Sequence, residues 1–83
     1  MPYYRATFST GRVISRERSW FKCSHAWLVH DRHMPIDDGF SPSLEGAKLA
    51  AGFARNKWKL LHPDADDCSV EIVPTEIVAK GEK

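Results

Sequence analysis

The chain has 83 residues, of which 42% are hydrophobic and 28% are charged, and its formal net charge is +1. This length predicts one domain with a thin margin of stability, and the composition is typical of globular rather than disordered proteins. The sequence contains no run of about 18 apolar residues, so we expect no membrane-spanning helix.

The first predicted element is a strand over residues 3–9. Apolar and polar side chains alternate along it, and a period of two is typical of a strand with one buried face. Thr10 and Gly11 predict a turn, since glycine accepts a positive φ without steric cost. Residues 12–17 are then either a second strand or a continuation of the first.

The next strand is predicted over residues 21–31, which are rich in aromatic and β-branched side chains. One of its faces carries Phe21, Cys23, His25, Trp27 and Val29, and the other carries Lys22, Ser24, Ala26 and Leu28. Residues 33–39 follow as a predicted loop, because Pro35 and the run Asp37-Asp38-Gly39 are turn signals.

A long amphipathic helix is predicted after this loop. Ser41 is the expected N-cap and Pro42 the first helical residue, while Glu45 places negative charge near the positive end of the helix dipole. Pro63 ends the helix. Its apolar stripe recurs at spacings of three and four and consists of Leu44, Ala47, Ala51, Ala54, Trp58 and Leu61.

An acidic turn over residues 64–67 leads to a final strand over residues 69–73. Pro74 cannot donate to a strand ladder, which favours an edge position for this strand. The order of elements predicts one α+β domain over residues 1–83, with residues 80–83 as a frayed tail. We expect an antiparallel sheet of three to four strands, packed on one face against the single helix and open to a partner on the other.

The residues able to carry chemistry form no established motif. Cys23 and His25 share a strand face, and thiolate and imidazole are zinc ligands, but no recognised ligand spacing accompanies them. Four further residues could join them in the fold: His30, His33, His62 and Cys68. A Cys–His nucleophile pair would need a pocket, for which so short a chain leaves little room. The acidic residues 64–67 lack the glycine and terminal glutamate of an EF-hand loop. We therefore expect that the protein is not an enzyme and binds no cofactor. Whether Cys23, His25 and Cys68 bind a metal stays open at this point.

Charge is distributed unevenly along the chain. Residues 1–33 carry a net charge of +4, whereas residues 63–83 carry a net charge of −4. A basic end can mark a nucleic-acid face, and two oppositely charged ends can equally attract each other within the fold. The second arrangement is the commoner one.

A basic and aromatic segment is the predicted partner-binding surface. Its members are Arg12, Arg16, Arg18, Trp20 and Lys22. Such side chains contact phosphates and stack on bases, and aromatic and arginine anchors also dominate the energetics of protein–protein interfaces. The competing interpretation is a charged strand that protects a sheet edge from pairing.

Two segments resemble small phage and prophage accessory proteins: residues 16–27, RERSWFKCSHAW, and residues 39–48, GFSPSLEGAK. The members of this group share no function or catalytic residues, but many bind host machinery, as the anti-CRISPR proteins do. The resemblance implies a setting in which a small protein binds host machinery. Because the chain is aromatic-rich, has no catalytic constellation and is expected to expose one sheet face, we expect a non-enzymatic inhibitor of a host protein or ribonucleoprotein complex, such as a CRISPR effector.

The alternative is a small nucleic-acid-binding domain that uses the basic, aromatic sheet face. In either case we expect a cytoplasmic protein in the host cell, since the first residues lack the apolar segment of a signal peptide and two cysteines are too few for a disulfide scaffold. The small size is also compatible with a homodimer, because oligomerisation commonly stabilises small scaffolds.

Overall fold

The computed structural model describes residues 3–17 and 22–78, which form six strands and one helix. In chain order these are β1 (Tyr3–Thr7), β2 (Val13–Glu17), β3 (His25–Asp31), β4 (Met34–Ser41), α1 (Leu44–Leu61), β5 (Cys68–Pro74) and β6 (Glu76–Val78). The strands build two antiparallel sheets of three strands, in the orders β2-β1-β6 and β4-β3-β5. The predicted α+β class is confirmed, with the strands divided between two sheets rather than gathered in one.

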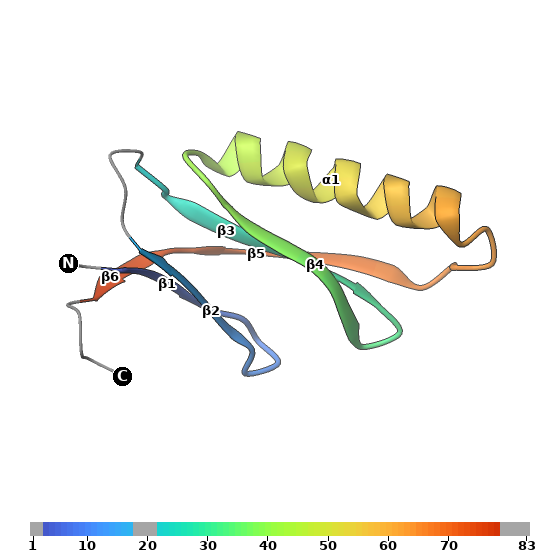
Figure 1. The fold of residues 1–83 in the computed structure, drawn as a ribbon, viewed down its shortest axis with the longest axis horizontal. Coiled ribbons are helices and arrows are strands. Elements are labelled where there is room, and N and C mark those ends of the chain that lie inside the picture. The colour runs from blue at the N-terminus through green and yellow to red at the C-terminus, as the bar shows by residue number, and fades with distance from the viewer. Residues whose placement is uncertain (1–2, 18–21, 79–83) are drawn as a thin grey trace.

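The elements form three layers, with the β4-β3-β5 sheet in the middle (Figure 1). Helix α1 runs along one face of this sheet, and the β2-β1-β6 sheet packs against part of the other. Only Thr75 separates β5 from β6, so a nearly continuous stretch of chain passes from one sheet to the other. Pro74 ends β5, which is an edge strand as its proline predicts. Within the described ranges, no helix is long and apolar enough to cross a membrane.

Strand β3 is buried on both of its faces. Ala26 and Leu28 are 0% exposed and pack with Ala6 and Phe8 of the β1 segment. Trp27 and Val29 point the other way and pack under α1. From Ala26 to Val29 the predicted division of side chains between two faces is thus correct, although residues 22–24 lie ahead of the strand. The expectation of an open face is wrong here. The second sheet covers it.

The predicted loop over residues 33–39 is also wrong, because most of it belongs to β4. A two-residue turn at Arg32 and His33, with φ of 52° and 71°, joins β3 directly to β4 as a hairpin. The register shifts between Val29 and His30, so β4 contains a bulge. Pro35 is tolerated beside it because β4 lies at the edge of its sheet.

Gly39 is required by packing and not by a turn. It pairs with Trp27, and a Cβ atom at this position would lie 2.8 Å from the Trp27 ring. The indole therefore occupies the space that any other residue's side chain would need. A glycine that looked like a turn signal in the sequence instead makes room for the largest aromatic ring of the core.

The N-cap of α1 and its first helical residue, Leu44, each lie two positions later than the predicted Ser41 and Pro42. Ser43 is the N-cap, and its hydroxyl accepts a hydrogen bond from the backbone N–H of Gly46 at 3.0 Å. The predicted cap, Ser41, is buried at the end of β4 instead. Glu45 lies in the first turn as expected, and the helix ends just before His62 and Pro63.

Replacing Leu28 with alanine tests the enclosure of β3. Leu28 is 0% exposed between the two sheets, so L28A removes packing contacts and leaves a cavity. We expect the free energy of unfolding to fall by about 2–5 kcal/mol in urea denaturation. The matched control is Leu60→Ala, at a side chain 82% exposed, where a change of at most about 0.5 kcal/mol is expected. Similar losses in both variants would contradict the enclosure of β3.

A pair of glycine substitutions tests the contact between Gly39 and Trp27. Gly39→Ala should lower the free energy of unfolding by about 1–3 kcal/mol, because the new methyl group overpacks the indole. Gly52→Ala should raise it by about 0.5–1 kcal/mol, since Gly52 lies within α1 with nothing within 4 Å of its added Cβ. Thermal unfolding of both proteins measures the two changes in stability. If both substitutions changed the stability in the same direction, the proposed role of Gly39 would be refuted.

Candidate functional site

Two of the five predicted partner-binding residues already have partners within the fold. The guanidinium of Arg12 forms an ion pair with Asp38 at 3.1 Å, and that of Arg16 lies 5.3 Å from the ring centre of Phe40. Both partners belong to β4, so these arginines tie the β2 side of one sheet to the edge of the other. The described part of the chain thus gives Arg12 and Arg16 a structural role beside any binding role.

Of the other three predicted residues, the structure describes only Lys22. Lys22 is exposed ahead of β3. Arg18 and Trp20 lie outside the described residues. Whether the five residues form one surface therefore stays a prediction.

The most prominent exposed apolar surface is the outer face of α1. Leu49, Phe53 and Leu60 are 63%, 72% and 82% exposed. With Asn56 they form a row along the helix, which we call the outer row. Monomeric proteins rarely leave contiguous apolar surface of this kind open, and where they do it often marks a site of interaction.

The outer row repeats the spacing of the inner, core-facing row. Ala47, Ala51, Ala54 and Trp58 form the inner row, at intervals of four, three and four residues. The outer row has the same intervals displaced by two positions, which rotates it by about 200° around the helix axis. The predicted apolar stripe contained the inner row, but it also contained Leu44 and Leu61, which are 41% and 66% exposed. The outer row was missed, although its repeated spacing is visible in the sequence.

The outer row is flanked by basic side chains. Helix α1 carries Lys48, Arg55, Lys57 and Lys59 against one acidic residue, Glu45. None of these four basic residues forms an ion pair with a described residue, whereas Arg5, Arg12 and Arg32 each do. The helix therefore presents an apolar row and unpaired positive charge on the same exposed surface.

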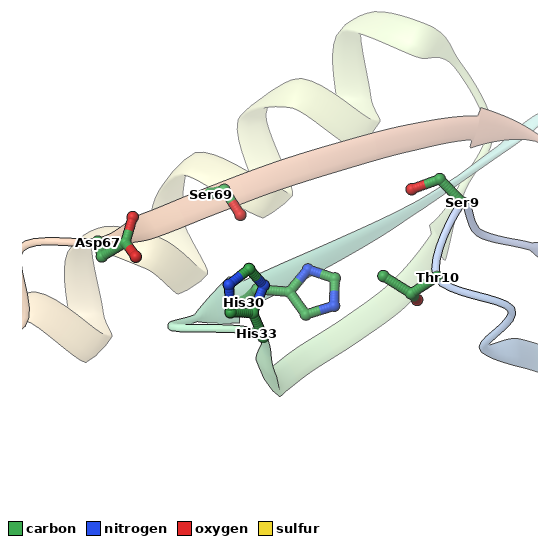
Figure 2. A pocket seen from close by; sticks show the side chains of 6 residues that line it. All are labelled: Ser9, Thr10, His30, His33, Asp67 and Ser69. Carbon is green, nitrogen blue, oxygen red and sulfur yellow. The ribbon is translucent and has the colours of Figure 1, made fainter.

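A polar pocket at the end of the β3–β4 hairpin is the main alternative site (Figure 2). Its volume is about 190 Å³. It is lined by Ser9, Thr10, His30, His33, Asp67 and Ser69. His30 is 8% exposed, and His33 comes from the turn with positive φ. The pocket thus collects two imidazoles and several hydroxyls, but among the described residues no group of three or more His, Cys, Asp or Glu could hold a metal ion.

The residues considered for zinc are separated along the sheet. The register of β3 with β5 pairs His25 with Pro74 and Asp31 with Cys68. His25 and Cys68 therefore lie at opposite ends of the paired strands, about 20 Å apart for a rise of about 3.3 Å per residue. Cys23, two residues before His25, lies at the same end as His25. The fold does not gather these three residues into one set of ligands.

Comparisons of the chain with protein-family models, with curated proteins and with solved structures found no match. The choice of binding surface consequently rests on the geometry and chemistry of this chain.

Replacing Arg12 and Arg16 together tests their structural role. We expect R12A/R16A to lower the free energy of unfolding by about 1 kcal/mol, because an exposed ion pair and an exposed cation–π contact each contribute about 0.5–1 kcal/mol. Lys22→Ala, at an exposed position, should change it by less than about 0.5 kcal/mol. Urea denaturation of the two proteins measures the difference. If the free energy of unfolding of the double variant equalled that of the wild type, neither contact would hold the sheets together.

Proposed function

We propose that the chain is a non-enzymatic protein-binding module that inhibits a host protein or complex, with a CRISPR effector as the candidate target. The observation that carries the proposal is the outer row of α1. Phe53 and Leu60 are more than two-thirds exposed, although large apolar side chains contribute about 1.5–3 kcal/mol when they are buried. A partner that covers the row would recover that stabilisation on binding.

The chemistry of the surface supports protein binding over catalysis. Interface cores are enriched in aromatic side chains and are surrounded by a polar rim, and Phe53 among lysines has this arrangement. In the described polar pocket, by contrast, the Ser9 hydroxyl donates its hydrogen bond to Glu71, and no hydrogen bond joins it to either histidine as a Ser–His nucleophile pair requires. The inhibitory role and the host setting are supported by the resemblance of residues 16–27 and 39–48 to small phage proteins.

Nucleic-acid binding is the second candidate function. It is favoured by the exposed lysines beside Phe53 and by Lys22, since aromatic and basic side chains together bind single strands. Arg12 and Arg16, which this function would use on the sheet, already contact Asp38 and Phe40. Binding of this kind would weaken steeply with salt through counterion release, and a salt-independent affinity would contradict it.

Phe53→Asp tests the protein-binding function. In pull-downs from nuclease-treated host lysate, wild-type protein should retain one host protein or complex in stoichiometric amount. Phe53→Asp should retain at least about tenfold less of it, because a carboxylate in an apolar contact loses its hydration. Quantitative mass spectrometry of the retained proteins provides the measurement.

The matched control for that experiment is Val13→Asp. Val13 is 53% exposed on β2, so the change adds the same charge at a distance from α1. Val13→Asp should retain the target like the wild type. Equal retention by the Phe53 variant, or recovery of nucleic acid alone when nuclease is omitted, would contradict the proposed function.

A further inference from the structure

The outer row has the spacing of a seam between two helices. Intervals of four, three and four residues are those of alternating d and a positions in a heptad, which assigns Leu49 and Asn56 to d and Phe53 and Leu60 to a. In the same register Lys57 and Lys59 occupy the e and g positions that border the seam. Ala51 and Trp58 fall at f and face the protein's own sheet.

The size of the row limits what can bind it. Each partner of a stable complex contributes about 800 Å² of surface, and three apolar side chains supply only part of that area. A partner must therefore also engage the border of the seam. That border carries Lys57 and Lys59, neither of which has an ion-pair partner within the described part of the chain.

We propose that the outer row binds an amphipathic helix of a partner protein, and that glutamate or aspartate side chains of this helix flank its apolar seam. The inference rests on the proposed protein-binding function and names the chemistry of the partner. The apolar row supplies the contact area, and the lysines select partners with acidic flanks, as charged e and g positions do between paired helices. Asn56 interrupts the apolar row, and a partner helix must place a hydrogen-bonding side chain opposite it, because a buried amide needs a partner.

A second copy of the chain fits this surface less well. Helix α1 has four basic residues and one acidic residue, for a net charge of +3. Two copies joined through their outer rows would bring two such helices together. Their mutual repulsion opposes association, whereas an acidic helix neutralises the same charge.

A lipid surface also fits the row poorly. Helices that lie in a membrane interface bury a broad apolar face. On α1 the inner alanines contact the β4-β3-β5 sheet, and the exposed apolar side chains are those of the outer row, which Asn56 interrupts, together with Leu44 and Leu61 near the two helix ends. A narrow apolar row of this kind is typical of a helix that packs against one other helix.

Two synthetic helical peptides test the inference on the full chain. Both contain the same leucine seam with one asparagine, and they differ only in having glutamate or lysine at the flanking positions. Titration calorimetry should give a Kd at least about tenfold lower for the glutamate peptide. Phe53→Asp should abolish that binding. The double variant Lys57→Glu/Lys59→Glu should reverse the preference to the lysine peptide, and Val13→Asp should behave as the wild type.

Other results would overturn the inference. Equal or undetectable affinity for both peptides excludes selection by acidic flanks. A dimer in light scattering that Phe53→Asp dissociates would assign the row to a second copy, and Phe53-dependent binding to phosphatidylserine vesicles would assign it to a membrane. If a host protein is retained through Phe53 while neither peptide binds, the proposed function stands and this inference fails. If Phe53 affects neither experiment, both fail.

Discussion

The two-sided burial of β3 is the constraint on which the rest of the structure depends. Four consecutive residues, Ala26 to Val29, are covered from opposite sides by different layers. The bulkiest of them, Trp27, requires small neighbours, which the chain supplies as Gly39 in β4 and as Ala47 and Ala51 in α1. Close packing around one indole thus determines the composition of both the adjoining strand and the helix.

That constraint also explains the unusual composition of α1. Beside Trp27 its inner face carries alanines, and further along the helix Trp58 of the inner row donates a hydrogen bond to Asp31, while Phe53 and Leu60 face outward. Turning a phenylalanine inward would bury more apolar surface, but the space next to Trp27 accommodates only small residues. The core therefore accounts for the small residues inside the helix and gives no reason for large apolar residues outside it. The proposed binding role would supply that reason.

Features that depend on local sequence patterns could be predicted from the sequence, whereas features that depend on strand pairing could not. The helix and the alternation along β3 were correct, because periodicity alone indicates them. Strand β4 was missed because Pro35 and Gly39 are turn formers in isolation, and only pairing with β3 turns them into a bulged edge strand. Arg12 and Arg16 could not be assigned structural roles beforehand, since their partners lie in that missed strand. The outer row needed no tertiary information, because its spacing equals that of the inner row.

The distribution of ion pairs connects the fold to the proposed binding surface. Arg5 contacts Glu76 at 2.6 Å and Arg32 approaches Asp66 at 3.6 Å, so basic residues of the first half meet acidic residues near the C-terminal end. The uneven charge along the chain is in this part an attraction within the fold. The basic residues of α1 have no such partner among residues 3–17 and 22–78. Positive charge that the fold leaves uncompensated beside an uncovered apolar row is thus available to a partner, and this coincidence favours an acidic helix over an uncharged one.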